Sequence, residues 1–114
     1  MTALTTAKEM AALLAEAGIR AVVDPAKAGP PCVLITPPAR AYDLPDGYTA
    51  TWVLYALASP PGDEHAWSDL DRIADAVASV LPVRSVQPTW YIVPSAPESL
   101  PAYQLTLIEA PQCQ

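Results

Sequence analysis

The sequence is poor in several residue types on which common functional sites depend. Its 114 residues include four glycines, two cysteines, one histidine and no phenylalanine. The few glycines leave little room for a phosphate-binding loop, and none of the patterns GxSxG, HExxH and GxxxxGK[ST] occurs. Cys32 and Cys113 form no CxxC pair, which argues against a redox or zinc motif. We expect two reduced thiols rather than a disulfide.

Basic residues are also scarce. Six lysines and arginines stand against twelve acidic residues, and no two of the six are adjacent, so the formal net charge is −6. A chain without a basic stripe is poorly suited to grip nucleic acid, and an acidic surface disfavours binding to anionic membranes. The first ten residues lack the pattern of a signal peptide, and the longest charge-free run, residues 47–62, is too short to span a bilayer. We therefore expect a soluble cytoplasmic protein.

What the chain does contain is enough apolar sequence for one folded domain. About half of the residues are apolar, and the length is typical of a single domain, here residues 1–114. Fourteen prolines predict stiff connections. Without phenylalanine, the bulky contacts of the core are expected from Trp52, Trp67, Trp90 and the five tyrosines.

Two helices are predicted. The first covers roughly residues 6–17, with Thr6 and Glu9 as a capping box and Gly18 as its C-terminal residue. The second begins after Asp63 and ends before Pro82. The apolar stripe of the first helix is Met10, Leu13, Leu14 and Ala17. The apolar face of the second is Trp67, Leu70, Ile73, Ala74, Val77 and Leu81.

Five strands are predicted from β-branched and apolar runs. They cover residues 19–24, 31–37, 48–59, 85–95 and 101–110. The strand at 31–37 is apolar at consecutive positions, so both of its faces should be covered. The order is α-β-β-β-α-β-β, and short connections favour antiparallel pairing. We predict an α+β fold: a two-layer sandwich, mainly an antiparallel sheet of four to five strands, with two helices on one face.

Candidate catalytic groups are weak. His65 is flanked by Asp63 and Glu64, but three consecutive residues at a helix start cannot converge on one metal ion. Asp71 and Asp75 share a helix face, which is typical of a solvated surface. We assign no catalytic, cofactor-binding or metal-binding residue and do not expect an enzyme.

The order of the segments carries a family resemblance. A short capped helix leads into "AGIRAVVDPA", "GPPCVLITPP", a long loop and "YTATWVLYAL". The helix "AWSDLDRIADAVASVL" and the closing strand "PAYQLTLIEA" follow. Over nearly the whole chain this order resembles the tail terminator proteins of long-tailed (siphovirus-type) bacteriophages. The richness in alanine and proline is in keeping with phages of actinobacterial hosts.

The resemblance implies a structural virion protein without a cofactor. Such proteins form a hexameric ring that caps the head-proximal end of the tail tube and ends its polymerisation. The ring joins the tube, built of the major tail tube protein, to the head–tail connector or stopper protein. The implied location is the virion tail, after assembly in the host cytoplasm. DNA would pass through the lumen without specific binding, which an acidic wall favours.

The stretch "GPPCVLITPPARAYDLPDG", residues 29–47, is the expected contact region. Two proline pairs bracket a strand, and a polar loop over residues 39–47 follows. Proline pairs stiffen an edge and reduce the entropy lost on assembly. The candidate interface residues are Arg40, Tyr42, Asp43, Asp46 and Tyr48, because tyrosine and arginine are enriched at interfaces.

Other interpretations remain open at this point. The chain can also be read as another head–tail connection protein, a stopper or an adaptor. A small ligand-binding regulatory α+β module is a third interpretation, because such folds host many functions. An enzyme with a site between subunits is the least favoured.

Overall fold

The fold is built around one long strand whose residues alternate between buried and partly exposed positions. The computed structural model describes residues 3–24, 26, 31–44, 47–58, 64–92, 100–108 and 112–113. These form two helices and one seven-stranded sheet. The helices are α1 (Ala3–Glu16) and α2 (Glu64–Val80). The strands are β1 (Ala21–Val22), β2 (Cys32–Ile35), β3 (Ala39–Leu44), β4 (Gly47–Leu57), β5 (Val83–Tyr91), β6 (Leu100–Ile108) and β7 (Gln112–Cys113).

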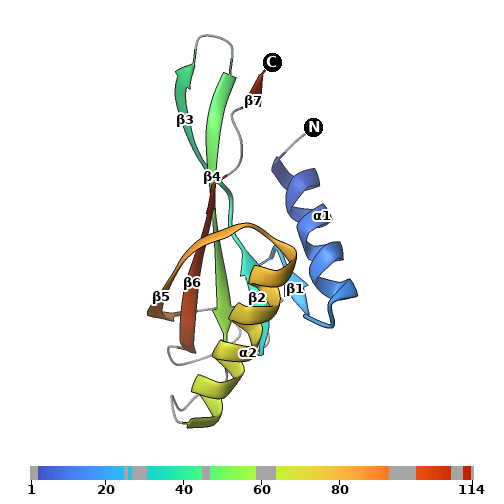
Figure 1. Ribbon diagram of the computed structural model, residues 1–114, viewed down its shortest axis with the longest axis vertical. Helices are drawn as coiled ribbons and strands as arrows, with labels where there is room; N and C mark the ends of the chain where they lie inside the picture. The colour runs from blue at the N-terminus through green and yellow to red at the C-terminus, as the bar shows by residue number, and fades with distance from the viewer. Residues whose placement is uncertain are drawn as a thin grey trace.

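The sheet has the order β1-β2-β4-β6-β5, with β3 and β7 also paired to β4 (Figure 1). All pairs are antiparallel except β1 with β2. The register of β4 places Ala56 opposite Val33 of β2 on one side and Tyr103 of β6 on the other. The predicted α+β class with a mainly antiparallel sheet is confirmed.

Both helices pack on one face of the sheet. The main core joins Leu14 of α1 and Val77 of α2 to Trp52 and Leu54 of β4, all nearly inaccessible to solvent. Residues of the opposite face form a smaller apolar cluster: Cys32, Leu34, Leu57, Leu100 and Ala102. The four residues of β2 are buried whichever face they occupy, as the consecutive apolar run predicts.

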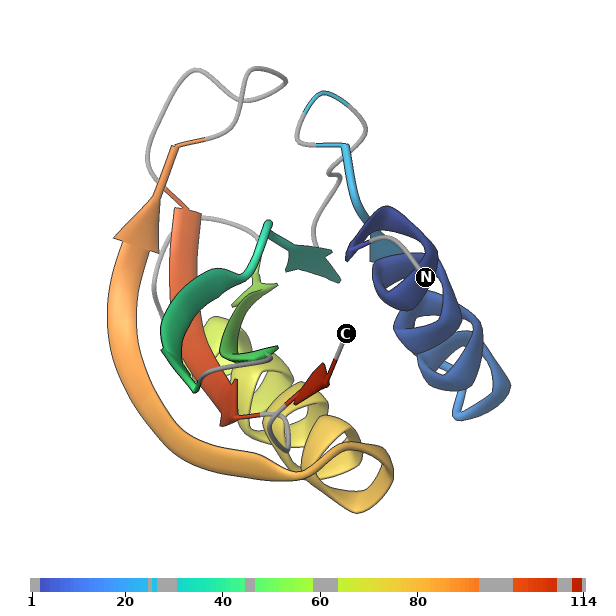
Figure 2. The ribbon, with the colours of Figure 1, turned by 90° about the horizontal axis from the view of Figure 1, so that it is seen from above.

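The molecule is elongated because the sheet extends past its helices. Its principal extents are 47 × 27 × 23 Å. In Figure 1 the β3–β4 hairpin projects at one end, and the N-terminal end of α2 lies at the other. Viewed along the long axis, the sheet is strongly curved and β5 bends round toward the C-terminal end of α2 (Figure 2).

The expected loop over residues 39–47 was wrong. Residues Ala39–Leu44 form β3, which pairs with the first half of β4 through Ala39↔Thr51, Arg40↔Ala50 and Ala41↔Thr49. Hydrogen bonding to β4 makes this segment a strand although the side chains of residues 39–42 are exposed. The expectation of antiparallel neighbours also failed for β1, a two-residue strand parallel to β2.

The first helix begins earlier than predicted and buries a shifted stripe. It starts at Ala3, so Thr6 lies inside it and cannot be its N-cap. Ala7, Met10 and Leu14 are buried, whereas Leu13 is 45% exposed. The predicted end is confirmed: Gly18 has φ +82°, its N–H bonds Ala15 O, and the Ile19 N–H bonds Leu14 O. These two bonds make a Schellman motif.

The second helix agrees with its predicted limits and mostly with its predicted face. Its buried residues are Ala66, Leu70, Ile73, Ala74 and Val77. Asp63, the residue before the predicted start of this helix, lies outside the described residues. In the described part of the chain, no helix has the length and apolar character needed to cross a membrane.

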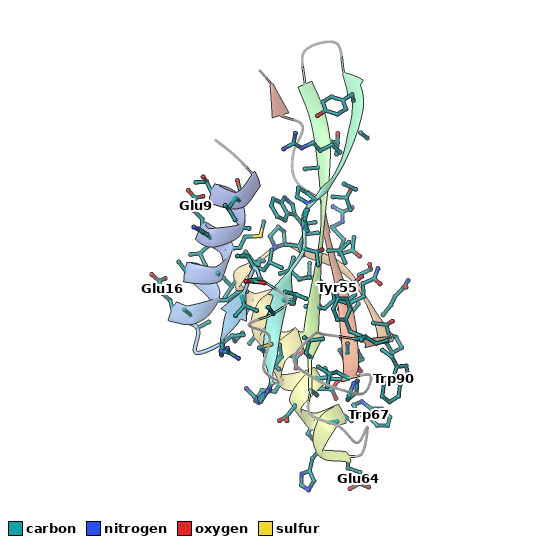
Figure 3. All side chains as sticks on the ribbon, turned by 180° about the vertical axis from the view of Figure 1, so that it is seen from behind. Glu9, Glu16, Tyr55, Glu64, Trp67 and Trp90 are labelled. Atoms are coloured by element: carbon teal, nitrogen blue, oxygen red, sulfur yellow. The ribbon has the colours of Figure 1, made fainter. Side chains whose placement is uncertain are left out.

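The three tryptophans do not share one role, contrary to the prediction that all supply core contacts. Trp52 of β4 is 2% exposed. Trp67 and Trp90 are 66% and 62% exposed, because both lie at the end of the molecule where α2 begins and β5 ends (Figure 3).

Candidate interaction surfaces

The β3–β4 hairpin forms a projecting arm, here defined as residues 39–44 and 47–51. Thr36–Pro38 separate β2 from β3, yet both strands pair with β4. The Thr36 hydroxyl donates to Val53 O over 2.6 Å and holds this junction to β4. Pro37 and Pro38, with no N–H, end one ladder before the next begins. The second proline pair thus divides one edge of β4 between the body and the arm.

Two of the five predicted interface residues have described side chains on the arm. Arg40 and Tyr42 lie two residues apart on β3, so they share a face. The Arg40 guanidinium donates to the Tyr42 hydroxyl over 3.3 Å, and Tyr42 is 64% exposed. Asp43 and Tyr48 lie in β3 and β4, and Asp46 falls outside the described residues. The structure therefore brings Arg40 and Tyr42 together at an exposed site.

At the opposite end of the molecule lies an apolar groove of about 820 Å³. Its described lining comes from the first half of α2, the end of β5 and the start of β6. These residues are Glu64, Ala66, Trp67, Leu70, Pro88, Thr89, Trp90, Pro101, Ala102 and Tyr103. The floor residues Ala66, Leu70 and Pro101 are buried, whereas Trp67 and Trp90 stand exposed (Figure 3).

A polar group marks one side of this groove. The Tyr103 hydroxyl donates to Asp71 Oδ1 over 3.3 Å. Burial raises the pKa of Tyr103 above its ordinary value of 10.0, and the Asp71 charge and hydrogen bond raise it further. A hydrogen bond from the Trp67 side chain acts in the opposite direction. Tyr103 is therefore neutral across the physiological pH range, and Glu64 is the single charged residue in the described lining.

Trp67 and Trp90 were expected in the core, and their exposure was not predicted. Trp67 stands three residues before Leu70 and four before Asp71. Both spacings place neighbours on a helix face, so Trp67 lies between the buried and the solvated side. Asp71 was already assigned to the solvated face of the helix, so the four-residue spacing from Trp67 to Asp71 could have indicated that Trp67 is exposed. Trp90 follows Pro88 in an edge strand whose side chains are mostly exposed, which one sequence alone does not reveal.

The remaining candidates do not converge on a chemical site. His65 is exposed at the start of α2, and Cys32 is buried in β2. Asp69 pairs with Arg72 over 3.5 Å on the exposed face of α2. Within the described residues, no group of three or more histidine, cysteine, aspartate or glutamate side chains could hold a metal ion.

Comparisons with known proteins assign no family. No family model, curated protein or solved structure matches the chain. The function must therefore be argued from the arm, the groove and the charge of the molecule itself.

Proposed function

We propose that the protein is a structural subunit of a phage tail: a tail terminator whose hexameric ring caps the tail tube. In this role it ends polymerisation of the tube protein and joins the tube to the head–tail connector. The observation that carries the proposal is the arm, which extends the sheet beyond its helices (Figure 1). Ala50 anchors the base of the arm in the core, whereas the described side chains of β3, residues 39–42, are exposed and well placed to contact a neighbour.

The exposed side chains support an assembly role. Large aromatic side chains stand in solvent at both ends of the molecule: Tyr42 on the arm, and Trp67 and Trp90 at the groove. Tyrosine, tryptophan and arginine are the residue types most enriched among the side chains that dominate binding energy at interfaces. Such residues at two separated sites suit a subunit with neighbours on both sides.

The net charge suits a passage for DNA. Each subunit carries a formal charge of −6, so a closed ring is strongly acidic. An acidic wall repels phosphates and lets DNA pass without specific binding. The exposed acids of α2, such as Asp75, are the proposed lumen residues.

The direct test is assembly on tubes. The purified chain is added to a polymerising phage tail tube protein, and tube lengths and ends are measured by electron microscopy. We expect shorter tubes with a six-fold cap at one end only. Tubes of unchanged length with bare ends would overturn the terminator assignment. A cap that forms only on connector complexes, and never on tubes, would identify a stopper or an adaptor instead.

The groove favours a second candidate function, a small ligand-binding module. Its volume of about 820 Å³ falls in the range typical of ligand pockets, and its lining is mostly apolar with few polar groups. Binding to the folded state alone would raise the melting temperature in proportion to the logarithm of ligand concentration. A thermal-shift screen with aromatic and apolar small molecules tests this function. Shifts abolished by Trp67→Ala and Trp90→Ala would support it.

A further inference from the structure

The groove and the arm have complementary chemistry. The groove offers two exposed indoles over an apolar floor, with Glu64 as its charged lining residue. The arm carries an exposed phenol beside a guanidinium, Tyr42 and Arg40. An aromatic ring fits an apolar slot, and an arginine pairs with a carboxylate or stacks on an indole.

We propose that the arm of one copy docks in the groove of a second copy, with Tyr42 between Trp67 and Trp90 and with Arg40 near Glu64. This inference rests on the proposed function only in that a ring requires some contact of this kind. The occupant of the groove is thus a second copy of this chain.

A copy cannot fill its own groove. The arm and the groove lie at opposite ends of a molecule whose long axis measures 47 Å (Figures 1 and 3). The contact therefore joins two different patches on two copies. In a head-to-tail arrangement every pair leaves one arm and one groove open, so copies add until the rotation closes a ring or, where it does not close, a filament grows.

Side-chain docking suits this surface better than strand addition. Among the described strands, β5 pairs with β6 alone, and its other edge has no described strand beside it. Pro88 stands inside β5 and removes one N–H donor, which is a common protection of edge strands. Pro88 and Trp90 also line the groove, so the arm is held there by apolar and charged side chains rather than by a continued ladder.

The first test uses two variants that each lose one partner of the contact. Tyr42→Ala removes the arm ring, and Trp67→Ala removes one wall of the groove. Both side chains are exposed, so both variants should fold. We expect each to raise the Kd of self-association at least 30-fold, about the effect of losing an interface hot spot. Val86→Ala is the matched control, because Val86 is exposed on β5 but lies outside the described groove lining.

Mixing the two variants distinguishes docking of an arm in a groove from contacts of arm with arm or of groove with groove. The arm of Trp67→Ala and the groove of Tyr42→Ala are both intact, so an equimolar mixture has one working contact. Native mass spectrometry should find heterodimers and no larger species. A mixture that restores full rings, or one that forms no heterodimer, overturns the docking arrangement.

A charge exchange tests the polar part of the contact. Arg40→Glu and Glu64→Arg should each weaken association, and the double variant should regain most of it. If the double variant associates no more tightly than either single variant, the pairing of Arg40 with Glu64 is contradicted.

Self-association of the wild-type chain is first measured at about 1 mM protein, a concentration at which even a contact with a millimolar Kd is populated. A wild-type chain that stays monomeric there overturns the docking proposal, while the terminator function is judged separately on tubes. Six-membered rings that persist in both variants overturn the docking and leave the function standing. Arm-dependent filaments or dimers without closure support the docking and contradict the ring function.

Discussion

At the scale of single residues, the end of α1 depends on one backbone conformation. Gly18 has φ +82°, and a Cβ at this position would meet no atom within 4 Å. The cost of a side chain there is therefore conformational and not steric contact with neighbours. We expect Gly18→Ala to lower the free energy of unfolding by about 1 to 2 kcal/mol in urea denaturation. Gly18→Asn should lose less, because asparagine tolerates the left-handed region. Equal losses would contradict this account.

The Tyr103–Asp71 pair gives a second prediction, on pH. The pKa of Tyr103 is raised in the folded protein, first by burial and then by Asp71. The folded state thus holds this proton more tightly than the unfolded state. The stability contributed is complete below pH 10 and declines as pH rises above the ordinary tyrosine value of 10.0.

Removing the Asp71 charge should reverse part of this shift. In Asp71→Asn, the pKa of Tyr103 should fall toward its ordinary value but remain above it, because burial persists. Ultraviolet titration of tyrosinate, compared between the wild type and the variant, measures the change. Asp75→Asn, one turn further along α2, is the control and should leave the titration unchanged. A rise in the Tyr103 pKa in Asp71→Asn would contradict the assignment.

At the scale of elements, two neighbouring leucines define which face of α1 is buried. Leu14 is inaccessible and belongs to the main core, whereas Leu13 is 45% exposed. We expect Leu14→Ala to cost about 2 to 5 kcal/mol of unfolding free energy. Leu13→Ala should change it by about 0.5 kcal/mol or less. Denaturant unfolding of both variants checks the face, and similar losses would mean that α1 docks in another rotation.

The elements could be predicted where their periodicity reports on the core. The apolar repeat of α2 was predicted from the sequence, because burial of residues such as Leu70, Ile73 and Val77 enforces that pattern. β3 was missed because Ala-Arg-Ala-Tyr has no buried face, so its pairing with β4 leaves no apolar signature. The parallel direction of β1 could not be predicted, because a two-residue strand carries no sequence pattern that indicates which strand it pairs with or in which direction.

For the candidate sites too, what could be predicted from the sequence differs from what depends on the tertiary arrangement. Arg40 and Tyr42 were proposed as interface residues from residue type and the resemblance; the structure shows that both are exposed on the arm, and their role in an interface stays a prediction. The groove was not predicted, because it unites α2, β5 and β6 from segments separated along the chain. Trp67 and Trp90 look like core residues in a chain without phenylalanine. Only the tertiary arrangement leaves them exposed.

At the scale of the whole molecule, the acidic charge leads to a prediction about DNA passage through the proposed ring. Asp75 is exposed on α2, the helix proposed to line the passage, and Glu9 is exposed on α1. Particles built with Asp75→Lys should eject their DNA more slowly than wild-type particles, because a lysine in the lumen binds phosphates. Glu9→Lys introduces the same charge change on the other helix and should have little effect. Unchanged ejection in the Asp75 variant would show that α2 does not face the lumen.

The continuity of β4 has a mechanical consequence. Its eleven residues run without a break from the arm into the core, flanked by β3 and β7 at one end and by β2 and β6 at the other. Antiparallel hydrogen bonds lie across the strand direction, so tension along β4 loads many of them together in shear. A pull on the tip is thus transmitted to the centre of the sheet instead of unzipping its margin, and in the proposed assembly this strand would carry load between neighbouring subunits.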